Sequence, residues 1–230
     1  MSNSLKNDVL FINVDGMADF YESPRMITQN EFTAEFRIEK VENIKKVLID
    51  HGYRVKLLNP TQNADIKIPV FKSLVSNTDM DEGKIDYSIF VLKHLYDYIK
   101  EEKFTHIINF HYDGYPINFD KWDDSFLNYD CLGSATSIID LDGHYFSLKN
   151  NREGIHLNGG FSLRSVELLK RCMDIPLEDF AKLYKMKGCT NDDLIINDYI
   201  DWKRMPIDTR IATKFSGKPN NLESFGFHGH

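Results

Sequence analysis

A strand, helix, strand pattern in the first 60 residues constrains this chain more than any other feature of its sequence. The apolar run Val9–Val14 stops abruptly at Asp15, as a buried strand does where it delivers a polar loop. Apolar residues then recur at helical spacing over residues 36–48, and Gly52 provides a good C-terminal cap for that helix. Residues 53–58 indicate a second strand. Because the links are short, this order predicts a parallel sheet in an α/β fold.

The same pattern returns in the middle of the chain. Residues 85–99 carry apolar side chains at helical spacing, and the apolar residues 106–110 predict a core strand beside Val9–Val14. That strand ends in the polar turn 111–114, which contains a carboxylate. Between the two units, residues 62–82 indicate only one strand or short helix followed by a loop. The middle of the chain therefore predicts a second alternating unit of the same sheet.

Composition and charge exclude several classes of protein. The chain has 230 residues, of which 42% are hydrophobic and 27% charged, so it can bury a sizeable core and does not resemble disordered, collagenous or coiled-coil proteins. A net charge of -7 disfavours nucleic acid as a partner. No apolar run reaches the roughly 18 to 20 residues of a membrane span, and residues 1–8 are too polar for a signal peptide. We therefore expect a cytoplasmic protein without a membrane span.

The chain has no linker rich in Pro, Gly or Ser that would divide it into separate domains. We predict a single domain over residues 1–230. Its nucleotide-binding half would comprise residues 1–115, and its acceptor half residues 116–230.

Two segments after predicted strands can contact a ligand. In parallel α/β sheets ligands bind at the carboxyl ends of strands, where Asp113 could hold a hard cation against phosphate oxygens. The alternative is a turn aspartate that accepts a local hydrogen bond. In residues 158–165, Gly159 and Gly160 let the backbone approach a bulky ligand, although turns use the same residues. Ser162 and Arg164 alternate with apolar neighbours, which predicts a strand with one packed and one hydrogen-bonding face.

Two further candidates lie near the end of the chain. Asp192 and Asp193 open a predicted helix, so one can cap it while the other points elsewhere. His228 lies close to two glycines and can be a metal ligand, unless the terminus is disordered. The three cysteines are widely spaced, which disfavours disulfides and zinc, and a buried thiol is the better interpretation of Cys131 than a nucleophile.

The order of these motifs carries a resemblance that spans the chain from about Tyr87 to its end. The motifs are Tyr87-Ser88, HYDGYPIN (111–118), Trp122, Tyr129-Asp130, NGGFSLRS (158–165), Asp192-Asp193 and FGFHG (225–229). Together they resemble a family catalogued as a domain of unknown function, whose members are similar to nucleotide-sugar glycosyltransferases of the GT-A type. The order and spacing of the motifs are more specific than any one of them.

The resemblance implies a GT-A-like, Rossmann-like domain with a mostly parallel central sheet flanked by helices. It implies transfer of a sugar from a nucleotide-sugar donor to a hydroxyl of a glycan or lipid-linked sugar acceptor, in glycan or surface polysaccharide synthesis. Asp113 would be the last acid of the metal-binding Asp-x-Asp signature, with His111 in place of the first acid. His228 would be a second contact to Mn2+ or Mg2+, or to the diphosphate. Asp193 would be the base of an inverting reaction, and Asp192 a cap or acceptor-orienting group.

The same resemblance implies a donor-binding set drawn from the strand ends and the shared motifs. We expect the nucleotide sugar to contact Asn13, Asp15, Tyr87, His111, Tyr112, Asp113, Gly114, Asn158, Gly159 and Gly160.

Two other functions compete with a transferase. A phosphatase with an Asp-x-Asp-Gly nucleophile is excluded because Asn13 occupies the nucleophile position, and an amide cannot form an acyl phosphate. A non-catalytic carbohydrate- or nucleotide-binding domain stays open, and Trp122, Tyr112 and Tyr115 favour carbohydrate binding.

Overall fold

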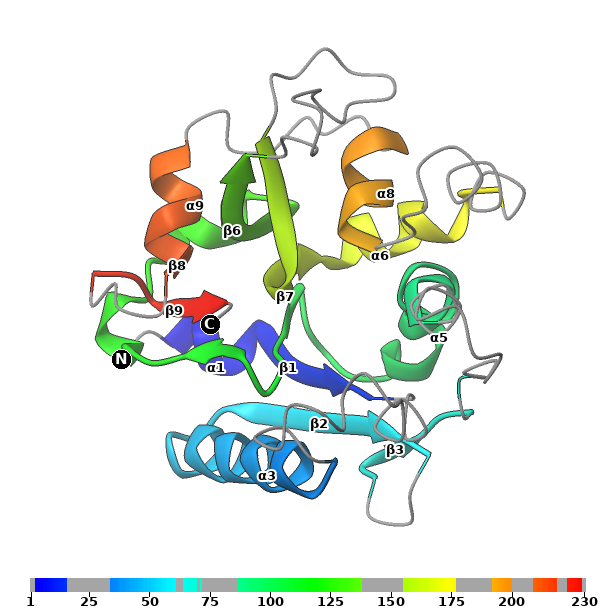
Figure 1. The fold of residues 1–230 in the computed structure, drawn as a ribbon, viewed down its shortest axis with the longest axis horizontal. Helices are drawn as coiled ribbons and strands as arrows, with labels where there is room; N and C mark the ends of the chain where they lie inside the picture. The colour runs from blue at the N-terminus through cyan, green and yellow to red at the C-terminus, as the bar shows by residue number, and fades with distance from the viewer. Residues whose placement is uncertain are drawn as a thin grey trace, which may run out of the picture.

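The structure, a computed structural model, describes residues 3–15, 34–60, 64–69, 71, 87–137, 155–176, 192–199, 209–218 and 223–228. These residues form a mixed α/β domain around a six-stranded, mostly parallel sheet flanked by helices (Figure 1). In spatial order the strands are β3 (Ile66–Lys67), β2 (Arg54–Asn59), β1 (Val9–Val14), β4 (His106–Asn109), β7 (Ile155–Ser165) and β6 (Cys131–Ser137). The first four run parallel, whereas β7 is antiparallel to both of its neighbours.

The centre of the sheet confirms the predicted pair of core strands. β1 and β4 are parallel neighbours, with Val9 opposite His106 and Ile12 opposite Asn109. Every residue of both strands is buried, because helices or other segments cover both faces of the sheet. The carboxyl ends of the two strands therefore lie side by side and deliver Asp15 and His111 to the same edge.

Helices pack on both faces of this sheet. On one face, α3 (Ala34–Asp50) packs Ile44 and Leu48 against Phe11 of β1. The helix is followed by Gly52 at φ 80°, the left-handed conformation that suits a glycine cap, as predicted. The opposite face is covered by α5 (Leu95–Ile99), whose residues cluster with Leu10.

The helix predicted over residues 85–99 contains an irregularity that its spacing does not reveal. A π-helical turn, η2 (Phe90–His94), precedes α5. Further along the chain, α6 (Val166–Met173) is capped by Ser165, whose Oγ accepts a hydrogen bond from the Leu168 N–H at 3.0 Å. The remaining helices that the structure describes are α1 (Asn3–Asn7), α8 (Asp192–Tyr199), α9 (Thr209–Phe215) and the 3₁₀ turns η3 (Phe119–Lys121) and η4 (Asp124–Asn128).

A second, three-stranded sheet pairs a strand near the end of the chain with a strand from its middle. Its order is β5 (Gly114–Pro116), β9 (Gly226–His228) and β8 (Ser216–Gly217). Figure 1 labels β8 and β9 at the left of the molecule. β5 and β9 are antiparallel, and Gly114 is the register partner of His228. The segment that carries His228 is thus a paired strand, not a disordered terminus.

Several expectations concern residues outside the described ranges. The sequence predicts a hairpin-like segment around Gly143, over residues 140–148, and a helix after Pro176, and neither segment is described by the structure. Of residues 62–82, the structure describes 64–69 and 71, which include the two-residue strand β3. Within the described ranges, no helix is long and apolar enough to cross a membrane.

Candidate functional site

Three metal-ligand side chains from distant parts of the sequence meet at the carboxyl end of β4. His111 and Asp113 lie in the turn after β4, and His228 ends β9. Each offers one ligand atom, and these atoms lie within 4.8 Å of one another. His228 Nε2 is 3.9 Å from Asp113 Oδ2. We call His111, Asp113 and His228 the histidine–aspartate cluster.

Two glycines make room for the His228 imidazole. A Cβ on Gly160 would lie 1.9 Å from His228 Nε2, and one on Gly114 would lie 2.7 Å from His228 Cδ2. Real Cβ atoms do not approach that closely, so neither position tolerates a side chain while His228 stays in place. The sequence predicts that Gly160 leaves space for a ligand. In the structure the His228 imidazole fills that space.

Neighbouring polar side chains hold His111. Its Nε2 lies 3.1 Å from the Tyr87 hydroxyl and 3.3 Å from Asn109 Nδ2. Burial lowers the pKa of His111, an effect opposed chiefly by the nearby charge of Asp113. The imidazole is therefore neutral near pH 7, which is the form that binds a metal ion.

The chemistry of the histidine–aspartate cluster fits a divalent cation. Two imidazoles and one carboxylate favour a first-row transition metal such as Mn2+ over Mg2+, which prefers oxygen ligands alone. The cluster therefore adds His111 as a ligand candidate to the predicted pair of Asp113 and His228.

A second polar cluster lies deeper in the molecule. Arg164, which is 1% exposed, forms an ion pair with Asp192 at 2.5 Å from Nη2 to Oδ2. Its Nε also donates to Ser162 Oγ at 3.2 Å. Burial opposes protonation of Arg164, but the charge of Asp192 more than offsets this, so the pKa of Arg164 is raised. Arg164 therefore stays charged although it is buried.

Asp193 joins this deeper cluster through the backbone of Gly159. Its Oδ2 accepts a hydrogen bond from the Gly159 N–H at 3.0 Å. The Gly159 carbonyl accepts from Asn109 Nδ2 at 3.1 Å and from Ser162 Oγ at 2.9 Å. A Cβ on Gly159 would lie 2.9 Å from Arg164 Nη2, so this glycine makes room for the guanidinium. We call Arg164, Asp192 and Asp193 the arginine–aspartate cluster; Asn109 connects it to His111.

The remaining predicted donor-binding residues lie around the same edge of the sheet, and several have local partners. Asn13 is 5% exposed, and its Nδ2 donates to the Phe110 carbonyl at 2.8 Å, which ties the end of β1 to the end of β4. Asn158 Oδ1 accepts from the Gly160 N–H at 2.9 Å. The Arg37 guanidinium lies 4.3 Å from the centre of the Tyr112 ring. Asp15 lies near enough to His111 for its charge to favour the protonated imidazole.

Sequence reasoning missed the ion pair of Arg164 with Asp192 and the connecting role of Asn109. The alternation along residues 158–165 did place Arg164 on a hydrogen-bonding face. A buried arginine needs a carboxylate partner, and this need was the signal that could have directed attention to the acidic pair.

The prediction that Cys131 is a buried thiol is confirmed. The side chains of Cys131 and Cys172 are buried and free, and burial raises the pKa of each thiol to about 12. Neither is an activated nucleophile.

Comparison with known proteins places the sequence in a family. A model of the family DUF5672, described as a protein of unknown function, matches residues 73–228. The chain belongs to the DUF5672 family. The description of DUF5672 states no activity, and a search of curated proteins found no match.

Among solved structures, the DUF5672 chain is similar to the crystal structure of A197 from STIV. The match has 14% sequence identity and covers 75% of this chain and 71% of that chain, with a TM-score of 0.33. At this score the similarity carries no argument about fold or function.

Proposed function

We propose that this DUF5672 protein is a metal-dependent glycosyltransferase with a GT-A-like, Rossmann-like domain. It transfers a sugar from a nucleotide-sugar donor to a hydroxyl of a glycan or lipid-linked sugar acceptor, with inversion, in glycan or surface polysaccharide synthesis. The observation that carries this proposal is the convergence of His111, Asp113 and His228 at the carboxyl end of β4. Ligands of open α/β sheets bind outside such strand ends.

The chemistry of glycosyl transfer gives the histidine–aspartate cluster a role. The departing nucleoside diphosphate carries negative charge, which a divalent cation neutralises when it is bound. His111, Asp113 and His228 would hold that cation. Tyr87 and Asn109 hold the His111 ring in place, and Gly160 and Gly114 allow the His228 ring to approach.

A second requirement is a carboxylate that takes the proton of the attacking hydroxyl. Asp192 is a poor candidate, because protonating it would leave the Arg164 charge buried and unpaired. Asp193 keeps its carboxylate against the Gly159 N–H, one residue from the glycine that contacts His228. We therefore assign the base to Asp193 and a positioning role to Asp192. With a base behind the anomeric carbon, direct displacement inverts its configuration.

A transfer assay tests this proposal. Purified protein with Mn2+ is incubated with a panel of uridine and guanosine diphosphate sugars and simple aryl glycoside acceptors, and NMR reports the anomeric configuration of any product. Removal of a general base typically costs about 100 to 10,000-fold in rate, so Asp193→Asn should bind donor normally and lose transfer by that factor.

The other outcomes distinguish the competing functions. A product with retained configuration, or wild-type turnover in Asp193→Asn, contradicts the assignment of the base. Nucleotide binding without transfer to any acceptor supports a nucleotide-binding domain. Binding of free sugars without nucleotide binding supports a carbohydrate-binding domain.

A further inference from the structure

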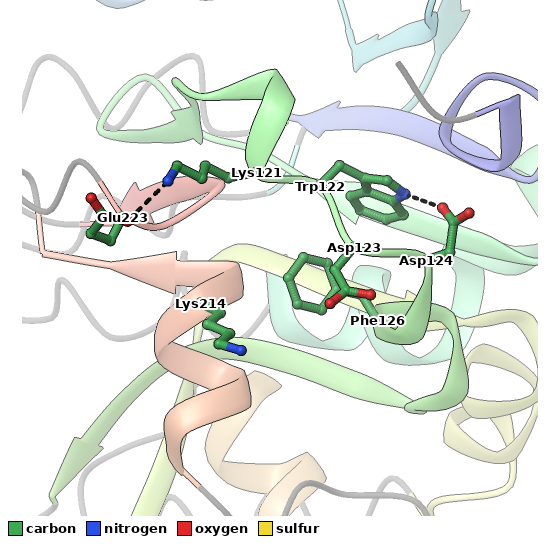
Figure 2. A pocket seen from close by; sticks show the side chains of 7 residues that line it. All are labelled: Lys121, Trp122, Asp123, Asp124, Phe126, Lys214 and Glu223. Atoms are coloured by element: carbon green, nitrogen blue, oxygen red, sulfur yellow. Dashed lines mark hydrogen bonds and ion pairs between the residues drawn. The ribbon is translucent and has the colours of Figure 1, made fainter.

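We propose that a pocket beside Trp122 is a second binding site, for a neutral carbohydrate, at the end of the sheet opposite the histidine–aspartate cluster. The pocket has a volume of about 560 Å³, within the range of about 300 to 1,000 Å³ typical of ligand sites. Figure 2 shows its lining, which consists of Lys121, Trp122, Asp123, Asp124, Phe126, Lys214 and Glu223. This inference does not depend on the proposed transferase activity.

The location of the pocket follows from one hydrogen bond. Asp124, in the pocket wall, accepts from the Ser4 hydroxyl, and Ser4 lies in α1 just before β1 begins. His111 instead follows the carboxyl end of β4, which runs parallel to β1. The six residues of β1 span roughly 17 to 20 Å at about 3.3 Å per residue, so the two sites lie about a strand length apart.

The aromatic wall of the pocket is held rigidly. The Trp122 Nε1–H donates to Asp124 Oδ1 at 2.8 Å. The indole also contacts Phe126 and Phe225 edge to face, with ring centres 5.4 and 5.2 Å apart. An aromatic surface that is ordered before binding loses little entropy when a ligand packs on it. A pyranose ring presents an apolar face that matches such a surface.

The polar wall offers both donors and acceptors. Lys121 pairs with Glu223 at 2.9 Å, and Asp123 is fixed because its Oδ1 accepts from the Ser125 N–H at 2.9 Å. Figure 2 shows Lys214 reaching from α9 toward Asp123. Within the described part of the chain, the Lys214 ammonium makes no hydrogen bond or ion pair, although its charge acts on Asp123, so it is available to a ligand hydroxyl.

The charged side chains that line the pocket disfavour an anionic ligand. Three carboxylates and two ammonium groups line the pocket, so a phosphate or nucleotide would meet net repulsion. A hydroxyl-rich neutral sugar can both donate to the carboxylates and accept from the ammonium groups. The combination of a rigid aromatic surface with alternating polar groups points to a neutral oligosaccharide.

Tryptophan fluorescence tests this site directly, because the chain has only two tryptophans, Trp122 and Trp202. In a Trp202→Phe variant, Trp122 is the sole indole, and maltohexaose, cellohexaose and chitohexaose serve as separate probes. We expect a saturable change in emission with at least one of them.

Calorimetry with that oligosaccharide then compares variants in the natural chain. Trp122→Phe should weaken binding about tenfold, as expected from losing part of an aromatic contact and its fixed orientation. Asp123→Asn and Lys214→Met, both at exposed positions, should each weaken it about threefold. Tyr98→Phe on α5, 37% exposed and outside the pocket lining, is the matched aromatic control and should bind normally.

Three results would overturn the proposal. They are no saturable change with any probe, unchanged affinity in Trp122→Phe, and loss of binding in Asp113→Asn, which would locate the sugar at the histidine–aspartate cluster instead. Circular dichroism checks that each variant folds. If Trp202→Phe does not fold, ligand-observed NMR on the natural chain and on Asp123→Asn replaces the fluorescence, with the same criteria.

Discussion

The histidine–aspartate and arginine–aspartate clusters adjoin neighbouring glycines, Gly160 and Gly159 respectively, but differ in how their charges are satisfied. Arg164 and Asp192 form a short, buried ion pair within the protein. The ligand atoms of His111, Asp113 and His228 lie up to 4.8 Å apart in partly buried side chains, a spacing that a shared cation can bridge. The comparison teaches that charged residues in one region can have separate roles, because the Arg164–Asp192 pair satisfies its charges within the protein, whereas we propose that the histidine–aspartate cluster binds a cation.

Breaking the buried pair should give the largest effect on stability. Asp192→Asn leaves the Arg164 charge buried without its carboxylate, which should lower the free energy of unfolding by about 3 to 5 kcal/mol in urea titrations. Asp97→Asn is the matched control, because Asp97 pairs with Lys100 at the surface and the change should cost about 0.5 kcal/mol or less. A loss below about 1 kcal/mol in Asp192→Asn would show that the arginine–aspartate cluster does not stabilise the fold as described.

A smaller change at Gly160 should act on the other cluster. Gly160→Ala places a methyl group where His228 Nε2 lies, so we expect a loss of about 1 to 3 kcal/mol in the free energy of unfolding, together with loss of Mn2+ binding. The double variant with His228→Ala removes the clashing ring, and there Gly160→Ala should cost much less. An equal cost in both backgrounds would mean that Gly160 is needed for some reason other than the imidazole.

The reactivity of Cys131 reports on how well the arginine–aspartate cluster is shielded from solvent, because Cys131 lies opposite Arg164 on the neighbouring strand. Burial raises its pKa from an ordinary 9.0 to about 12, so at pH 8 the folded chain should have on the order of 1,000-fold less thiolate than the unfolded chain. Alkylation of the peptide that contains Cys131, followed by mass spectrometry, should be slower by about that factor in the folded protein. Rapid labelling would show that the arginine–aspartate cluster opens to solvent.

The same shift predicts how stability depends on pH. The folded thiol holds its proton above the pKa of the unfolded thiol, so its contribution to stability is fully present below about pH 9 and declines as the pH rises from there toward about 12. Cys131→Ala should remove this part of the decline, as measured by urea titrations between pH 8 and 10.

Local patterns predicted the parts of the fold that depend on local chemistry. The apolar runs of β1 and β4, and the helix that ends before Gly52, are recognisable because burial and capping act within a few residues. The antiparallel β7 and the pairing of β9 with β5 depend on contacts between distant residues, which no local pattern encodes.

The candidate site likewise has a part that local patterns predicted and a part that depends on contacts between distant residues. Asp113 and His228 were predicted as a pair and lie 3.9 Å apart, whereas the addition of His111 depends on the turn after β4. The ion pair of Arg164 with Asp192 spans 28 residues and is determined by where α8 packs on β7. The glycines were recognised as places of close approach, but the sequence could not show that the approaching groups are the protein's own His228 and Arg164.

The most direct test of the central proposal is calorimetry of nucleoside diphosphate binding with and without Mn2+. The proposal predicts that at least one of UDP, GDP, ADP and CDP binds only when Mn2+ is present. Asp113→Asn should weaken that binding at least about tenfold while leaving the urea unfolding curve unchanged. Binding of equal affinity without the cation, or unchanged affinity in Asp113→Asn, would contradict the role of the histidine–aspartate cluster.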